Sequence, residues 1–198
     1  MRYGDRTLAG VLFLFGSTQF LLAMLIAEGS LPTYRVSQQA ISELGVGPTA
    51  LLFNASVILL GVSTLAAGYF YHRTHQVLWL TILFFVTGIG PIGVGLFPEN
   101  TGLPHGIFAL LAFLFGGLVA ILSSFRTRPP FRYISILLGV VGLVALALFT
   151  ARQYGGIGFG GMERMIAYPV LFWEIAFGGY LLSMAEPETP SVPPSPPA

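Results

Sequence analysis

Six long apolar stretches, separated by short connectors, set the strongest limit on how this chain can fold. A helix that crosses the hydrocarbon core of a membrane needs about 20 mostly apolar residues. The six stretches reach that length, and their predicted ranges are 8–27, 49–69, 77–97, 106–125, 133–151 and 165–184. The sequence therefore predicts an all-α fold, a polytopic membrane helix bundle with six transmembrane helices.

The scarcity of charge supports this prediction. Only 9% of the 198 residues are charged, whereas a soluble domain carries about 25%, and the mean hydropathy is +0.81. So few charges do not cover a water-facing surface, and lipid must be the solvent for much of the exterior. The chain has no cysteine, which excludes disulfides and thiolate chemistry. The formal net charge of +1 gives no indication of nucleic-acid binding.

Two parts of the chain differ in composition. Residues 1–184 are predicted to form the six-helix transmembrane domain. Residues 185–198 contain six prolines and almost nothing apolar, which is typical of a disordered, extended segment. We expect this Pro-rich tail to lie in the cytoplasm.

The arginines predict the orientation, because loops on the cytoplasmic side carry an excess of positive charge. The larger group falls on the side of the two chain ends: Arg2, Arg6, Arg73, Arg126, Arg128 and Arg132. The smaller group falls on the opposite side: Arg35, Arg152 and Arg164. We therefore expect a multi-pass protein of the cell membrane with both termini in the cytoplasm.

Glu174 is the most unusual residue of the predicted spans. It lies near the middle of the last span, where a charge costs roughly 2.5–3.5 kcal/mol on insertion scales. Two interpretations stay open: a functional site, or a carboxyl that ties helices together by hydrogen bonds. Glu163 precedes it by eleven residues, close to three helical turns, so both carboxyls are predicted on one helix face.

Further polar residues fall in the outer half of the predicted bundle. Gln19 and Asn54 lie within spans, and Arg164 adjoins the start of the last one. Glu99 and His105 lie in the loop after the third span. Their shared placement predicts a polar cavity that opens outward, with ligand contacts from Gln19, Asn54, Glu99, His105, Glu163, Arg164 and Glu174.

The third span contains Pro91 among four glycines, in the run 88–95. Proline removes a helical donor and crowds the preceding turn. The run therefore predicts either a kink that lines a cavity or close packing of helices through small residues. The long connector before the second span, residues 28–48, is expected to form a short helix between Ser37 and Gly45.

Three groups of residues together resemble domain-of-unknown-function family 998, a set of bacterial and archaeal multi-span membrane proteins. They are residues 39–45 with 53–56, residues 95–100 followed by His105, and residues 161–164 with 168–169 and 173–174. The resemblance covers about residues 8–184. It implies a six-helix membrane protein and supplies no activity, substrate or catalytic residue.

Three functions remain open. The first is binding or transport of a lipid or small apolar ligand in the outward-opening pocket. The second is an intramembrane enzyme, a hydrolase or transferase acting on lipid headgroups, with Glu43, Glu99 and His105 as candidate catalytic groups or metal ligands. The third is a structural or assembly subunit. We expect membrane lipids as partners, with no nucleic acid, no cofactor and no bound metal, and a homo-oligomer stays open as an alternative to a monomer.

Overall fold

The computed structural model describes residues 3–184 as a bundle of six long helices joined by short loops. The helices are α1 (Asp5–Gly29), α2 (Ala50–His75), α3 (Leu78–Leu96), α4 (Leu103–Ser123), α5 (Phe131–Thr150) and α6 (Gly158–Ser183). Three short 3-10 turns lie between them: η1 (Ser42–Gly45), η2 (Glu99–Thr101) and η3 (Ser124–Arg126). Each long helix has the length and hydropathy to cross a membrane, so the chain is a multi-pass helical membrane protein as predicted. The predicted tail, residues 185–198, lies outside the described residues, as does Arg2.

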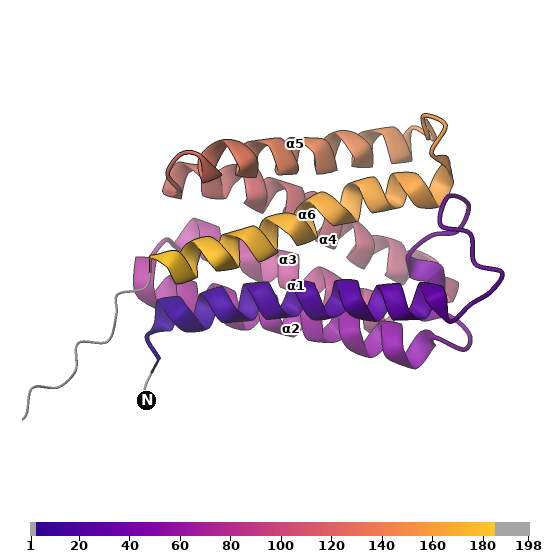
Figure 1. Ribbon diagram of the computed structural model, residues 1–198, viewed down its shortest axis with the longest axis horizontal. Helices are drawn as coiled ribbons and strands as arrows, with labels where there is room; N and C mark the ends of the chain where they lie inside the picture. Colours follow the sequence, from indigo (N-terminus) through magenta and orange to yellow (C-terminus); the bar gives the residue numbers. More distant parts are fainter. Residues whose placement is uncertain (1–2, 185–198) are drawn as a thin grey trace, which may run out of the picture.

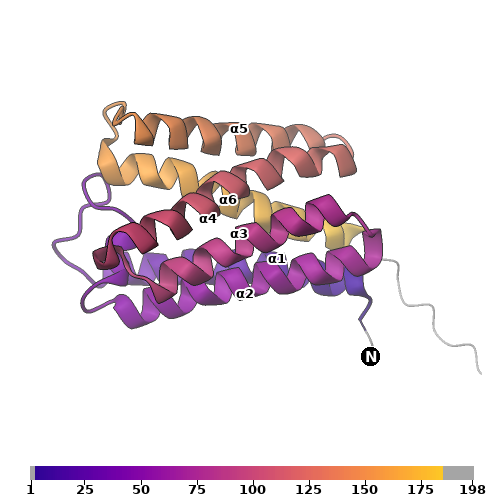
Figure 2. The same cartoon turned by 180° about the vertical axis from the view of Figure 1, so that it is seen from behind.

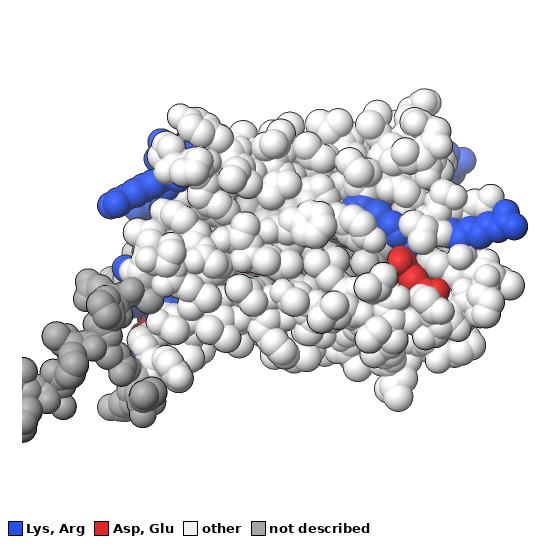
Figure 3. All heavy atoms as spheres, viewed as in Figure 1, with Lys and Arg blue, Asp and Glu red and all other residues white. Residues whose placement is uncertain are grey.

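The helices run up and down the bundle in chain order. Each packs on the next, and α6 packs on α1 to close the ring (Figures 1 and 2). The start of α1 and the end of α6 therefore lie at one end, which we call the terminal end, and Arg6 Nη1 donates to the Met184 carbonyl there at 2.5 Å. The loop of residues 30–49 lies at the other end, which we call the loop end. Charged side chains gather toward the two ends of the face in Figure 3, with a wide uncharged zone between them.

Two helices differ in extent from the predicted spans. Helix α2 continues to His75, because its last polar turn carries basic residues that suit a helix C-terminus and Gln76 ends it with φ of 51°. Helix α6 begins at Gly158, well before the predicted start at residue 165. Glu163 and Arg164 are consequently helical residues. The predicted helix between Ser37 and Gly45 is reduced to the single 3-10 turn η1.

Helix α3 is continuous through Pro91, and its glycines allow close helix packing. A Cβ on Gly88 would lie 2.8 Å from the Gly61 carbonyl of α2, and a Cβ on Gly90 would lie 2.5 Å from the Ala112 nitrogen of α4. Glycines serve the same purpose between α1 and α6, where a Cβ on Gly10 would lie 2.8 Å from the Gly178 carbonyl. Of the two interpretations of the glycine run, the structure therefore favours packing, although Pro91 also borders a cavity.

Replacing Gly88 with Ala should lower the melting temperature, because the added methyl overpacks the α2–α3 contact at a cost of about 1–3 kcal/mol. Gly179→Ala is the matched control, since a Cβ at this helical glycine meets nothing within 4 Å. We expect the control to melt at the wild-type temperature or slightly above, because alanine is the better helix former. Equal melting of the two variants in detergent would contradict the close-packing account.

Candidate functional site

A cavity lies inside the helix ring, in the half of the bundle next to the loop end. It encloses about 710 Å³ of empty space, its open mouth included. Helices α1, α2, α3, α4 and α6 and turn η1 contribute its walls, and α5 contributes none. Most of the lining is apolar, and the polar side chains among it are Ser42, Thr87, His105, Glu163 and Glu174.

The loop of residues 30–49 covers the cavity at the loop end. Ala40, Ile41 and Leu44 of this loop are buried, and Ile41 and Leu44 pack in one cluster with apolar side chains of α1, α2 and α6. By contrast, the lining residues that stay half-exposed belong to α4 or face it from α3: Val94, His105, Ala109, Ala112 and Phe113. The mouth of the cavity therefore runs along α4, near the loop end, where the surrounding medium is lipid or the membrane interface.

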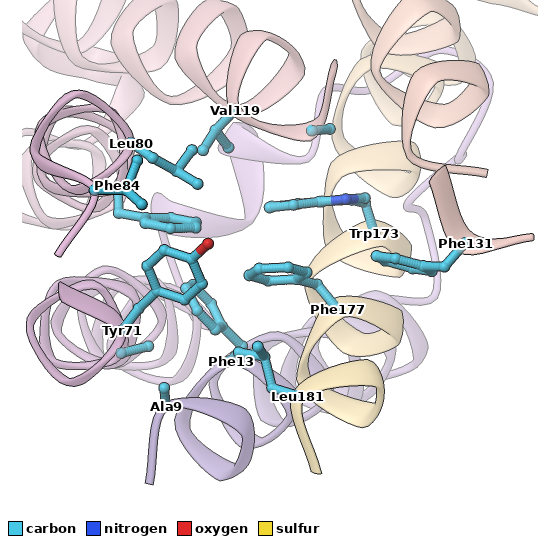
Figure 4. Packing of buried hydrophobic residues seen from close by; sticks show 13 residues of the cluster. Ala9, Phe13, Tyr71, Leu80, Phe84, Val119, Phe131, Trp173, Phe177 and Leu181 are labelled. Carbon is cyan, nitrogen blue, oxygen red and sulfur yellow. The ribbon is translucent and has the colours of Figure 1, made fainter. Parts of the chain in front are cut away.

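A cluster of aromatic rings closes the cavity toward the terminal end. The rings of Phe13, Tyr71, Phe84, Trp173 and Phe177 meet between α1, α2, α3 and α6 (Figure 4). The Phe13 and Phe84 centroids are 4.9 Å apart, and those of Trp173 and Phe177 are 5.0 Å apart. Each of these side chains is at most 2% exposed. The structure therefore holds a pocket with one closed end rather than a channel.

Glu174 lies at this closed inner end and is 3% exposed. Ser17 of α1 donates to its Oε2 at 2.5 Å, and Thr64 of α2 donates to its Oε1 at 3.2 Å. The carboxyl therefore ties three helices together and also lines the cavity. Glu174 therefore fits both interpretations drawn from the sequence: it ties helices together, and it lies where a ligand could reach it.

Glu163 lines the cavity nearer its mouth and is 6% exposed. The backbone N–H of Ile41 donates to its Oε2, so this carboxyl helps to hold η1 over the bundle. Ser42 and the carboxylate of Glu99 lie close by. Glu163 and Glu174 border the same cavity, in agreement with their predicted common helix face.

Arg164 points away from the cavity lining and fastens the covering loop. Its guanidinium is bonded to Glu28 Oε1, from Nη2 at 2.5 Å and from Nε at 3.2 Å. Nη2 also donates to the Tyr34 hydroxyl at 2.6 Å, while Nη1 donates to the carbonyls of Val36, Gln39 and Gly160. Arginine has five N–H groups, so these contacts use its whole donor capacity.

Tyr34 completes this fastening. Its hydroxyl donates to the Ala40 carbonyl at 2.7 Å while it accepts from Arg164. Burial raises the pKa of Tyr34 to about 12, so the hydroxyl keeps its proton. Gly160 makes the approach possible, because a Cβ there would collide with the Val36 and Gln39 carbonyls.

The remaining candidate residues at the loop end are arranged separately. Glu43 accepts from the Gln39 side chain at 3.0 Å and from the Ala40 N–H at 2.9 Å, which stabilises the loop. Burial raises the pKa of the Glu99 carboxyl and the nearby Glu43 raises it further, while the Ser42 hydroxyl and His105 lower it. His105 Nδ1 lies 2.9 Å from the Phe97 carbonyl. Within residues 3–184, no three His, Asp or Glu side chains are grouped closely enough to hold a metal ion.

Gln19 and Asn54 lie outside the cavity lining, in contacts between elements. Gln19 Nε2 donates to the Ser56 carbonyl at 2.9 Å and joins α1 to α2. Asn54 Nδ2 donates to the Gly45 carbonyl at 2.9 Å and joins α2 to η1. The sequence did not indicate Ser17 or Thr64 as contacts of Glu174, because small hydroxyls are ordinary residues in apolar helices and only their neighbours in space distinguish them.

A protein family described as "Protein of unknown function (DUF998)" matches residues 14–180 of the chain. The chain belongs to this family. The matched range contains every residue that lines the cavity of this DUF998 protein, as well as Arg164 and its partners. No match to a curated protein or to a solved structure was found.

Replacing Arg164 with Met should release the covering loop, because the variant leaves the Glu28 carboxylate and the Val36 carbonyl without their donor. Exposed Arg35 within this loop is a trypsin site that reports the release. We expect cleavage after Arg35 to become roughly tenfold faster or more, as the loss of a buried charge partner is strongly destabilising. Arg152→Met, an exposed arginine at the same end, is the control and should leave the cleavage rate unchanged.

Proposed function

We propose that this protein binds a lipid or small apolar molecule in the cavity between α1, α2, α3, α4 and α6. The observation that carries the proposal is a mostly apolar cavity within the membrane-spanning helices, with its half-exposed wall along α4 and a buried carboxyl at its inner end. Ligand pockets in proteins combine such apolar walls with a few placed polar groups. Glu163, Glu174, Thr87 and His105 are the polar groups that this cavity offers.

Selection of the ligand rests on those polar groups. Lipid tails are as apolar as the side chains of the wall, so moving an apolar chain from the bilayer into the cavity gains little hydrophobic free energy. Hydrogen bonds and charges act more strongly there than in water. A ligand must therefore offer partners for the carboxyls to be preferred over bulk lipid.

Transport would require the aromatic cluster to open. Phe13, Phe84 and Phe177 lie on three different helices, so a path to the terminal end needs these helices to separate. The described conformation supports binding from the loop end. If the protein also moves the bound molecule across the membrane, it must pass through a second conformation in which these helices have separated.

An enzyme acting on lipid headgroups is the second candidate. Ser42 and His105 both line the cavity, and the carboxyls of Glu99 and Glu163 lie beside Ser42. A hydroxyl, an imidazole and a carboxylate are the components of acyl-transfer catalysis. Loss of lipid hydrolysis in Ser42→Ala, with lipid binding retained, would favour this candidate over a binding protein.

We further propose that the protein resides in the cell membrane with its terminal end in the cytoplasm, because that end carries the larger group of arginines. Single cysteines can test this in a chain that has none. In intact cells, a membrane-impermeant maleimide should label Gln153→Cys at the loop end. It should label Ser183→Cys at the terminal end only after the membrane is opened. The reverse pattern would overturn the orientation.

A tryptophan at Ala109 should block the cavity, since this small residue lines it and stays half-exposed on α4. Native mass spectrometry of the detergent-extracted wild type should detect a bound lipid that Ala109→Trp lacks. Leu110→Trp is the matched control on the outer side of the same helix, where the side chain is 49% exposed. The proposal fails if the wild type carries no lipid, or if both variants retain it equally.

A further inference from the structure

The inner end of the cavity is rich in hydrogen-bond acceptors. Glu174 follows Trp173, whose ring stacks on that of Phe84 with centroids 6.4 Å apart. Thr87 lies three residues beyond Phe84 on α3, about one helical turn closer to the loop end. Thr87 and Glu174 both line the cavity, so the two side chains face its inner end from α3 and α6.

Thr87 has hydrogen-bonding capacity that the protein leaves unused. Its side chain is 4% exposed, and its Oγ1 is buried without a partner. Pro91, four residues later, has no N–H, so the carbonyl of Thr87 also lacks its usual helical donor. A buried polar group without a partner costs free energy, and a polar ligand in the cavity would supply what is missing.

Within the described part of the chain, no basic side chain forms an ion pair with Glu174. Of the residues that the structure describes, those lining the cavity include two glutamates and one basic group, His105, at the start of α4. The partners of Glu174 are the hydroxyls of Ser17 and Thr64, which carry no charge. Arg164, the nearest arginine to Glu163 along the helix, is held by Glu28. A cation with hydrogen-bond donors complements this end, because a buried carboxyl gives up its proton when such a cation lies beside it.

We propose that the cavity binds a long-chain primary amine, with its ammonium group against Glu174 and Thr87 and its chain along the apolar walls toward the mouth. This inference rests on the proposed function and names its ligand class. A primary ammonium has three N–H donors, which match the Glu174 carboxylate and the hydroxyl and carbonyl of Thr87. An alcohol has one donor and no charge, and a quaternary ammonium has charge but no donor.

The walls accommodate the chain of such a molecule. Leu60, Leu171 and Val57 line the cavity with apolar side chains, and the small side chains of Ala109 and Ala112 line it from α4. Phe20 of α1 also lines the cavity, and its ring packs against that of Phe53 with centroids 5.6 Å apart.

Binding of tritiated decylamine to the purified protein in lipid nanodiscs tests the inference, with decanol and decyltrimethylammonium as competitors of equal chain length. We expect decylamine to compete at about tenfold lower concentration than either, since a charge-assisted hydrogen bond contributes at least that factor. Glu174→Gln should remove this preference. Thr87→Val should weaken decylamine binding about tenfold, because it removes the hydroxyl that accepts from the ammonium group. The melting temperature of this variant should equal or exceed that of the wild type, because the methyl replaces a hydroxyl without a partner.

Thr87→Ser retains the hydroxyl and should retain the preference for decylamine, which separates a binding role from a packing role. If decylamine and decanol bind equally and Ala109→Trp blocks both, the cavity is a binding site but the amine inference is overturned. If no probe binds, or Ala109→Trp changes nothing, the proposed function itself is overturned. Equal decylamine binding by Thr87→Val and wild type would also reject the inference.

Discussion

A membrane interior offers no water to the backbone, and the architecture of this protein follows from that constraint. Backbone N–H and C=O groups in the hydrocarbon need partners within the protein, so the six apolar stretches form continuous helices. The Thr87 carbonyl, which faces Pro91 in α3, is an exception. Because lipid gives no hydrophobic force between helices, close packing has to hold them together. Glycine provides it between α2 and α3 at Gly61 and Gly88, and between α1 and α6 at Gly10 and Gly178.

The cavity exists where this close packing stops. Helix α4 meets α6 at Gly116, where an added Cβ would lie 2.7 Å from the Val170 side chain. Toward the loop end, Ala109 and Ala112 of the same helix border the cavity instead. The covering loop would leave this space open to water, were it not held by Arg164 and by the bond from the Ile41 N–H to Glu163. The two buried polar side chains of α6 therefore have different roles: Arg164 holds the covering loop in place, and Glu163 both binds this loop and lines the cavity.

The sequence predicted the region of the candidate site well, but it predicted the individual residues of that site less well. Scarce polar residues in the outer half of the predicted spans indicated where a cavity would lie, and Glu163, Glu174 and His105 do border one. Gln19 and Asn54 had the same sequence signal and lie between elements instead. A polar residue in a span must find a partner in either case, so the sequence signal is the same for a ligand contact and for an interhelical tie.

The sequence by itself determined the six helices and the membrane as their solvent, because length and apolar composition leave no other way to satisfy the backbone. It also determined that Glu174 would need a special environment, since no isolated charge is stable at that depth. Only the tertiary structure decided which environment that is. The hydroxyls of Ser17 and Thr64 come from helices 157 and 110 positions away in the sequence, and the unpartnered Thr87 faces the same cavity from a third. Such neighbours are set by how helices rotate and pack against one another, which depends on side-chain contacts that no local pattern encodes.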